Sequence, residues 1–317
     1  MTRVFVTASL PGKGLDKLSE SFKVEVFPED RSITHNELME GAKEADALIT
    51  LLTDRVDRAV INSSPNLRVI ANCAVGYDNI DLQYATGRGI FVTNTPGVLT
   101  DTTADLAWAL IMSVARWTAR GDAFVREGKF KIWRPKLFLG MDVYGKTLGI
   151  YGMGRIGEAV ARRAKGFNMR IIYYNRKRNE QGKKDTGASY VDFPTLLKES
   201  DFLVITAPLN KESQGRFGWE EFQEMKKTSI LVNVGRGPIV REKELARALK
   251  EGVIWGAGLD VYEREPEIGK GLLALENVVL LPHLGSASFE TRERMAEMAV
   301  RNVIAALNGE IPPNLVN

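Results

Sequence analysis

Three polar side chains in the second half of the chain have the types needed to reduce a carbonyl group. They are Arg236, Glu265 and His283, and each follows one of three successive apolar segments that predict β-strands. In a doubly wound parallel sheet, ligands and reactive groups gather outside the carboxyl ends of the strands. We therefore expect these three residues at one edge of one sheet.

The chemistry of the three side chains suits hydride transfer to a ketone or an aldehyde. Hydride arrival at the carbonyl carbon leaves negative charge on the oxygen, and a protonated His283 could supply the proton. Glu265, hydrogen-bonded to the other ring nitrogen, would favour the protonated ring and fix its orientation. The planar guanidinium of Arg236 would bind a substrate carboxylate and polarise the carbonyl.

The small numbers of histidine and cysteine argue against a metal site and against an internal disulfide. The chain has two histidines and one cysteine, so a zinc site is not expected, and the proposed chemistry needs no metal. The other histidine, His35, lies in a polar segment that predicts the start of a helix, where we expect an exposed or capping residue. The single cysteine, Cys73, cannot form a disulfide within the chain, which favours a reducing compartment.

A glycine motif predicts a dinucleotide site. The sequence Gly152-Met153-Gly154-Arg155-Ile156-Gly157 follows a predicted strand and opens a predicted helix. Gly152 would allow a tight turn, Gly154 would leave room for a pyrophosphate, and Gly157 would let the helix pack closely on the strand. The free amides of the helix N-terminus would face the phosphates. A glycine-rich turn without a ligand is the alternative, and the strand–turn–helix–strand context favours the cofactor.

The segment after the next predicted strand indicates which dinucleotide is bound. An NAD-selective site carries Asp or Glu here, where it accepts hydrogen bonds from the adenosine ribose. This chain has Asn175, followed by Arg176, Lys177 and Arg178. Arg176 could hold a 2′-phosphate bidentately, and its basic neighbours could add charge. We predict NADPH as the preferred cofactor and NADH as a weaker one; the alternative is a solvated basic loop.

Strand-like and helix-like segments alternate along the chain in two series. The predicted strands are 4–7, 23–27, 47–51, 67–71 and 90–94 in the first series, and 147–151, 170–174, 202–206, 230–234, 258–261 and 278–281 in the second. Such alternation predicts parallel sheets covered by helices on both faces. The fold class is therefore α/β, with two doubly wound parallel-sheet domains: a Rossmann cofactor domain and a flavodoxin-like substrate domain.

The two series meet near residues 96–97. A long apolar helix is expected from Thr102 to Trp117, with Asp101 or Thr102 as its N-cap, and its wide apolar surface predicts burial between domains or subunits. A last amphipathic helix, 288–307, is followed by no further strand, so we expect it to return to the first domain. The predicted domains are 1–98 with 288–317 for the substrate, and 99–287 for the dinucleotide.

Composition excludes several other classes of protein. The 317 residues are 44% hydrophobic and 26% charged, which is typical of an ordinary globular protein with two domains. A formal net charge of +3 gives no argument for nucleic-acid binding. No apolar run approaches the ~18 residues of a membrane span, and the N-terminus lacks the apolar stretch of a signal peptide. We expect a cytoplasmic protein that binds neither nucleic acid nor a membrane.

The sequence resembles the D-2-hydroxyacid dehydrogenases over essentially its whole length, and within that family the glyoxylate and hydroxypyruvate reductases. The matching stretches are 72–81 (NCAVGYDNID), 152–157 (GMGRIG), 233–237 (NVGRG), 256–261 (GAGLDV) and 282–287 (PHLGSA). The resemblance implies that Arg236, Glu265 and His283 form a catalytic trio. It also implies reduction of a small 2-oxo acid, either glyoxylate to glycolate or hydroxypyruvate to D-glycerate.

Further binding residues follow from the resemblance. The backbone amides of Val75 and Gly76 would bind the substrate carboxylate alongside Arg236. Asp260 would meet the nicotinamide carboxamide, and Thr103 would lie close to the cofactor. Val234, Gly235, His283 and Gly285 are also expected at the cofactor. Leu52, next to Leu51 at the end of a predicted strand, could form an apolar wall that favours small substrates, although ordinary packing explains it equally well.

Assembly and the exact substrate depend on the resemblance too. It implies a homodimer formed through the cofactor domain and the long helix. In some relatives an aromatic residue of the partner subunit reaches the active site; Phe130 or Trp133 could do so here, and core packing is the alternative. Two other functions stay open: a reductase of larger sugar acids such as 2-ketogluconate, and a nucleotide-sensing module like the corepressors that resemble this family.

Overall fold

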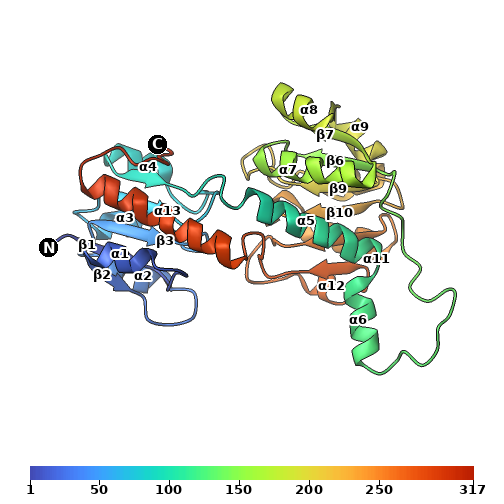
Figure 1. Ribbon diagram of the computed structural model, residues 1–317, viewed down its shortest axis with the longest axis horizontal. Helices are drawn as coiled ribbons and strands as arrows, with labels where there is room; N and C mark the ends of the chain where they lie inside the picture. The colour runs from blue at the N-terminus through green and yellow to red at the C-terminus, as the bar shows by residue number, and fades with distance from the viewer. The chain divides into compact units, whose positions relative to one another are not determined.

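The computed structural model describes residues 1–317, apart from the side chain of Lys183. The chain divides into two compact units: unit 1 comprises Met1–Leu99 and Ser286–Asn317, and unit 2 comprises Thr100–Gly285. Each unit is built on one parallel sheet (Figure 1). The prediction of an α/β fold with two parallel-sheet domains is therefore confirmed. Within the described part of the chain, no helix is both long and apolar enough to span a bilayer.

Unit 1 contains a five-stranded sheet in the order β2-β1-β3-β4-β5, with every pair parallel. The strands are β1 (Arg3–Val6), β2 (Lys23–Val26), β3 (Ala47–Thr50), β4 (Val69–Asn72) and β5 (Phe91–Thr93). This is the flavodoxin-like order. Both β3 and β4 are buried along their whole length, as central parallel strands are. Their carboxyl ends are neighbours, because Thr50 pairs with Asn72.

The last helix of the chain belongs to unit 1. The helices of this unit are α1 (Gly14–Ser19), α2 (His35–Ala42), α3 (Arg58–Ser63), α4 (Leu82–Gly87) and α13 (Phe289–Leu307). Helix α13 packs on α1, β3 and β4 (Figure 1). Beyond it, the Val316 N–H donates to the Val92 oxygen at 2.9 Å, so the C-terminal tail is held against β5. Unit 1 is therefore discontinuous in sequence.

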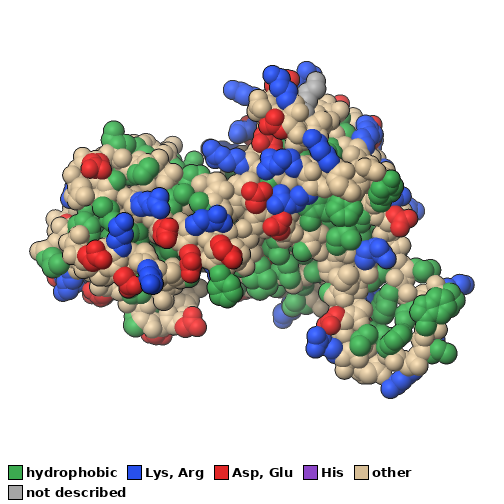
Figure 2. Space-filling view, viewed as in Figure 1, with side chains coloured by type: hydrophobic (Ala, Val, Ile, Leu, Met, Phe, Trp, Pro, Cys, Tyr) green, Lys and Arg blue, Asp and Glu red, His purple; other side chains and the backbone are tan. Residues whose placement is uncertain are grey.

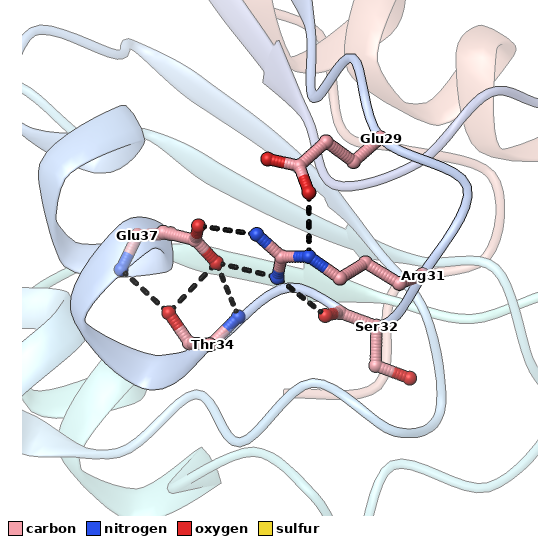
Figure 3. Close-up of polar contacts among 5 residues, drawn as sticks. All are labelled: Glu29, Arg31, Ser32, Thr34 and Glu37. Carbon is pink, nitrogen blue, oxygen red and sulfur yellow. Dashed lines mark hydrogen bonds and ion pairs between the residues drawn. The ribbon is translucent and has the colours of Figure 1, made fainter.

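Helix α2 begins at a capping box (Figure 3). Thr34 Oγ1 accepts the Glu37 N–H at 3.3 Å, and Glu37 Oε2 accepts the Thr34 N–H at 2.8 Å. Arg31 donates to both Glu37 oxygens, at 2.9 and 2.6 Å, and to Glu29 at 2.6 Å. The hydrogen bonds from Arg31 and Thr34 lower the pKa of Glu37 to about 2, so this carboxylate stays charged at neutral pH. The cap places His35 in the first turn of α2, exposed to solvent.

Unit 2 contains a seven-stranded parallel sheet in the order β12-β11-β10-β9-β6-β7-β8. The strands are β6 (Thr147–Tyr151), β7 (Arg170–Tyr174), β8 (Ser189–Tyr190), β9 (Phe202–Ile205), β10 (Ile230–Asn233), β11 (Gly256–Leu259) and β12 (Val278–Leu280). The order reverses between β6 and β9, which are hydrogen-bonded neighbours. This is the Rossmann arrangement, and ligands of such sheets bind at the reversal.

Helices cover both faces of the second sheet. The helices of unit 2 are α5 (Thr100–Ala115), α6 (Thr118–Arg126), α7 (Arg155–Ala164), α8 (Glu180–Thr186), α9 (Phe193–Glu199), α10 (Trp219–Glu224), α11 (Glu242–Lys250) and α12 (Lys270–Leu273), with short 3-10 turns η1 (Lys165–Phe167) and η2 (Gly237–Ile239). Strand β9 shows the two faces: Phe202 and Val204 enter the core shared with α5 and α7, whereas Leu203 and Ile205 enter the core shared with α9, α10 and α11. Double coverage explains why this strand is apolar throughout.

Two predicted elements of unit 2 start earlier in the structure than the sequence indicated. Helix α5 begins at Thr100, so Asp101 and Thr102 lie in its first turn and neither is the N-cap. Strand β11 begins two residues earlier than expected, at Gly256. A Cβ on the next glycine of this strand, Gly258, would lie 2.9 Å from Leu110 Cβ of α5. The strand therefore uses glycines to let α5 approach, and such residues carry little strand signal.

Candidate active site

The three expected catalytic residues leave adjacent strands of the second sheet. Strands β10, β11 and β12 are parallel neighbours. Arg236 follows β10, Glu265 follows β11, and His283 follows β12. The carboxyl ends of all three strands lie at the same edge of the sheet, so this edge collects an arginine, a carboxylate and an imidazole.

His283 and Glu265 form a hydrogen-bonded pair. His283 Nδ1 lies 2.7 Å from one Glu265 oxygen, and the other oxygen accepts the Tyr262 N–H at 3.0 Å. The side chains are 24% and 23% exposed, so the pair is partly screened from water yet open to a reactant. With Nδ1 bound to a carboxylate, Nε2 is the nitrogen suited to proton exchange. Both oxygens of Glu265 have defined partners, which orients the ring.

The backbone at His283 is held in an unusual conformation. Its φ of 53° lies in the left-handed region, which residues other than glycine adopt uncommonly. The His283 N–H donates to the backbone carbonyl oxygen of Asp260 at 3.0 Å, which fixes the end of β12 against the end of β11. Surrounding hydrogen bonds of this kind are what keeps a strained residue in place.

Asp260 organises the loop that follows His283. Its two oxygens accept the Leu284 and Gly285 N–H groups at 2.6 and 2.8 Å. The Thr103 hydroxyl donates to the Gly285 oxygen at 3.0 Å. Burial raises the pKa of Asp260 to about 6, against the Leu284 hydrogen bond and the attraction of His283. Through these two hydrogen bonds the Asp260 side chain holds the 283–285 turn at the sheet edge.

Arg236 leaves a turn that an asparagine closes. Asn233, the last residue of β10, accepts the Gly235 N–H at 3.0 Å and donates to the Arg236 oxygen at 3.0 Å. Arg236 Nη1 donates to the Gly235 oxygen at 3.0 Å, and the side chain is half-buried. Val234 is buried beneath this turn. Among the described residues, no group of three or more His, Cys, Asp or Glu side chains could hold a metal ion.

The glycine turn has the geometry that a dinucleotide requires. Gly152 has a φ of 105°, and a Cβ there would lie 2.5 Å from the Ala207 nitrogen. A Cβ on Gly157 would lie 2.6 Å from the Gly152 oxygen, so this glycine allows α7 to pack on the turn. At Gly154 a Cβ would meet nothing within 4 Å, so this side of the turn is open to a ligand. The Thr206 hydroxyl fixes the turn by donating to the Gly152 oxygen at 2.7 Å.

A pocket of about 1000 Å³ opens beside the glycine turn, where the strand order reverses. Its lining residues are Tyr151, Gly152, Met153, Gly154, Tyr174, Asn175, Arg176, Lys177, Thr206, Ala207, Pro208, Asn210, Glu212, Ser213 and Arg216. The expected cofactor residues of the turn and of the segment after β7 therefore share one cavity. Arg155 and Ile156 lie in the first turn of α7, the former exposed and the latter packed on the core.

Asn175 fixes the glycine turn from the end of β7. Its Oδ1 accepts the Met153 N–H at 2.6 Å, and its Nδ2 donates to the Met153 oxygen at 3.2 Å. Asn179 adds a second donor to the same oxygen at 2.8 Å. An aspartate at position 175 would direct a carboxylate oxygen at the Met153 carbonyl. The amide is therefore the side chain that suits this turn.

Two basic side chains of the segment after β7 line the pocket. Arg176 Nη1 lies 3.4 Å from Glu212 Oε2, and both side chains are about two-thirds exposed, at 67% and 66%. Lys177 is exposed at the same cavity. Arg178, which could also have added charge, instead lies over the ring of Tyr190, 5.0 Å from its centre. Of the basic run, therefore, Arg176 and Lys177 bring positive charge to the pocket, and Arg216 of the lining adds to it.

The expected substrate residues of unit 1 lie in two turns at one edge of its sheet. Leu52 follows β3, and Val75 and Gly76 follow β4; all three are half-buried. Because β3 and β4 are parallel neighbours, the two turns lie at the same edge. Buried asparagines at 72 and 94 support this edge, and nothing in the sequence pattern singled them out.

Sequence reasoning missed the part of the cofactor pocket that follows β9. Thr206, Ala207 and Pro208 line it, and the first two lie against Gly152 of the glycine turn. A signal was available, because β9 is the strand added after the reversal, and its carboxyl end must lie beside that of β6. The stacked rings of Tyr151 and Tyr174, 5.8 Å apart, form another wall that periodicity alone does not reveal.

Comparison with known proteins gives the family. Residues 108–285 match the model of the D-isomer specific 2-hydroxyacid dehydrogenase NAD-binding domain. A glyoxylate reductase from Pyrococcus furiosus is 54% identical over 319 aligned residues, which cover 99% of this chain and 95% of that protein.

Solved structures agree over the whole chain. A Thermus thermophilus protein superposes with a TM-score of 0.94 at 45% identity, with complete coverage of both chains. An NADPH-dependent glyoxylate/hydroxypyruvate reductase from Sinorhizobium meliloti, solved with NADP and malonate, superposes with a TM-score of 0.88 at 31% identity and covers 99% of this chain and 96% of its own. This chain belongs to the D-isomer specific 2-hydroxyacid dehydrogenase family.

Proposed function

We propose that this protein is an NADPH-dependent reductase of small 2-oxo acids, acting on glyoxylate or hydroxypyruvate. The observation that carries the proposal is the His283–Glu265 pair, 2.7 Å apart, on the sheet edge that also bears Arg236. Similarity to proteins named glyoxylate reductase, at 54% identity over nearly the whole chain, supports the choice of substrate.

The proposed reaction divides the work among the side chains. When bound, the reduced nicotinamide supplies a hydride to the carbonyl carbon. His283 donates the proton from Nε2 as the carbonyl π bond breaks, so the product is a 2-hydroxy acid. Glu265, bonded to Nδ1 of the ring, keeps His283 oriented. Arg236 binds the substrate carboxylate and stabilises negative charge on the oxygen, and the Val75 and Gly76 amides bind the same carboxylate.

The pocket of unit 2 fits a dinucleotide. The open side at Gly154 and the N-terminus of α7 suit a diphosphate. Asn175, Arg176 and Lys177 would hold the adenosine ribose and its 2′-phosphate. Glu212 is the one feature that opposes a phosphate here, and its exposed ion pair with Arg176 is weak enough to exchange.

A cofactor-by-substrate activity matrix tests the proposal directly. NADPH and NADH oxidation would be followed with glyoxylate, hydroxypyruvate and 2-ketogluconate. We expect the highest specificity constant for NADPH with one of the two small acids. A higher constant for 2-ketogluconate would instead favour a reductase of larger sugar acids. Absence of turnover by folded protein with every small 2-oxo acid would overturn the proposal.

Arg176→Ala is expected to weaken NADPH selectively. Loss of a charge-assisted contact to the 2′-phosphate should raise the KM for NADPH about tenfold, because each ~1.4 kcal/mol is a factor of ten. The KM for NADH should change less than about twofold, since NADH lacks this phosphate. Arg178→Ala is the matched control, because its guanidinium lies over Tyr190. Equal loss of NADPH and NADH use in Arg176→Ala would contradict the 2′-phosphate assignment.

We further propose that the protein forms a homodimer through unit 2. The segment that follows α6 projects from this unit, and Figure 2 shows hydrophobic side chains gathered on it. Phe130, Ile132, Trp133 and Leu139 are 53%, 64%, 73% and 63% exposed. Clustered apolar exposure of this kind marks an interaction site. A second copy would bury it symmetrically, and Phe130 or Trp133 would then be the residues to test for a role in the partner's active site.

A charge introduced on this segment should disrupt the dimer. Trp133→Glu is expected to shift the protein from a dimer to a monomer in sedimentation-velocity experiments at micromolar concentration, because a carboxylate cannot be buried there unpaired. Ile311→Glu in unit 1, at a residue 76% exposed, is the control and should leave the dimer intact. A wild-type protein that sediments as a monomer would contradict the proposal.

A further inference from the structure

Two carbonyl groups of the turn after β4 accept hydrogen bonds from residues that follow β5. The Ala74 oxygen accepts the Thr95 N–H at 2.8 Å. The Val75 oxygen accepts Asn94 Nδ2, also at 2.8 Å. In a trans peptide the C=O and the next N–H point in opposite directions. The contacts to Thr95 and Asn94 therefore direct the N–H groups of Val75 and Gly76 away from these two donors.

The third carbonyl of the turn is held by Asn72. Its Nδ2 donates to the Gly76 oxygen at 2.8 Å, and its Oδ1 accepts the Thr50 hydroxyl at 3.0 Å. Asn72 is fully buried at the end of β4. The carbonyl groups of three successive peptide units, 74–75, 75–76 and 76–77, are thus each bonded to a donor within unit 1.

The two amides that result are available to an anion. In the described part of the chain, the Val75 and Gly76 N–H groups donate to no protein acceptor, and both residues are half-buried. Successive backbone N–H groups with fixed directions form an anion-binding concavity. Because their carbonyls are already bonded, no reorganisation is needed when an anion arrives.

The same asparagine network reaches the turn after β3. Asn72 donates to Asn79 Oδ1 at 3.1 Å. Asn79 Nδ2 donates to the backbone oxygens of Leu51 and Asp54 at 3.0 and 2.8 Å. Asp54 itself accepts the Leu51 N–H at 2.7 Å. The turn that carries Leu52 is therefore tied to the turn that carries the two amides.

Asn94 is in turn fixed by the C-terminal part of the chain. The backbone N–H of Asn94 donates to the backbone oxygen of Asn314 at 3.3 Å, and the backbone oxygen of Asn94 accepts Asn302 Nδ2 of α13 at 3.3 Å. Asn302 also accepts the Asn314 N–H at 3.2 Å. Asn94 is only 8% exposed. The donor that holds Val75 is thus itself immobilised by residues more than two hundred positions away.

We propose that Asn94 is a positioning residue that aims the Gly76 amide at the substrate carboxylate, and that Asn72 supports it by fixing the next peptide unit of the same turn. The inference rests on the function proposed above, because it takes the substrate to be a 2-oxo acid. Neither asparagine touches the substrate; Asn94 sets the direction of an amide that does, and Asn72 holds the turn that carries this amide. Their loss should weaken carboxylate binding more than the chemical step.

Asn94→Ala and Asn94→Asp in the full-length protein test the inference. Oxamate, a non-reducible carboxylate analogue, serves as the probe. In Asn94→Ala we expect the KM for glyoxylate and the dissociation constant of oxamate, measured by calorimetry with NADPH present, to rise about tenfold, while kcat changes less than about twofold. Asn94→Asp, which has the same size but turns an acceptor toward the Val75 oxygen, should lose more.

Asn277→Ala is the matched control. Like Asn94, Asn277 donates from its side-chain amide to the backbone, in this case to the Leu249 and Trp255 carbonyls, but it lies in unit 2. It should lower thermal stability without changing oxamate affinity. If Asn94→Ala does not fold, the isosteric Asn94→Asp carries the comparison.

The outcomes separate this inference from the reductase proposal. Oxamate affinity within twofold of wild type in a folded Asn94 variant would show a purely structural role and overturn the inference. Wild-type protein that binds oxamate without reducing glyoxylate would contradict the reductase proposal, and the expected order of variants would still support the positioning role. Wild-type protein that binds no oxamate would overturn both.

Discussion

Replacing His283 by asparagine is expected to lower kcat for glyoxylate reduction by about a thousandfold, within the roughly 10²–10⁴ range of general acid catalysis. Asparagine can keep a hydrogen bond to Glu265, but it cannot supply a proton to the developing alkoxide. The KM for NADPH should change less than about threefold, because the pocket beside the glycine turn does not include this residue. Steady-state kinetics and NADPH fluorescence titration measure the two quantities.

His35→Asn is the control for this experiment. His35 is the other histidine of the chain and lies exposed in the first turn of α2. Its replacement should leave kcat unchanged. The comparison also separates a catalyst from a nucleotide-sensing module that keeps the cofactor site and works through partners. If wild type and His283→Asn show the same low turnover and the same NADPH affinity, the sensing role is favoured.

The fold was predictable where strands carry β-branched and apolar residues. Strand β9, buried on both faces, is visible from its sequence because both faces must be apolar. Strand β11 was misplaced because glycines that admit α5 replace the usual strand residues. Strand β8 has only two residues, too few for any alternation to show. The local errors thus occur where tertiary packing, not local preference, chooses the residue.

The candidate site was predictable where chemistry restricts the residue type. Arg236, Glu265 and His283 could be found because each is a reactive side chain after a predicted strand, and the sheet order then makes those strands neighbours. Asn72 and Asn94 could not be found in this way. An asparagine at a strand end is common in turns, and its role depends on which carbonyl the neighbouring turn presents. That information exists only once the pairing of β4 and β5 is known.

Arg236 should be the second most damaging position to change. Arg236→Gln is expected to lower kcat/KM for glyoxylate by about a thousandfold, and Arg236→Lys by about a hundredfold, because loss of one preorganised donor to a developing oxyanion costs roughly 10²–10³. Lysine keeps the charge but lacks the planar fork that can contact a carboxylate at two points. Hydrogen bonds of Asn233 fix the turn that carries Arg236. A lysine ammonium or a glutamine amide could reach the position of the guanidinium only if this turn moved.

Two further measurements make the Arg236 prediction specific. Added guanidinium should partly restore activity to Arg236→Ala but not to His283→Asn, because it replaces the lost donor and not the lost proton source. Arg241→Gln, at an exposed arginine paired with Glu244, is the control and should behave as wild type. If Arg236→Lys retained full kcat/KM, a point charge would suffice, and the role assigned to the guanidinium fork would be wrong. Two results together would support bidentate binding of the substrate at Arg236. They are recovery of Arg236→Ala by guanidinium, and a smaller loss of kcat/KM in Arg236→Lys than in Arg236→Gln.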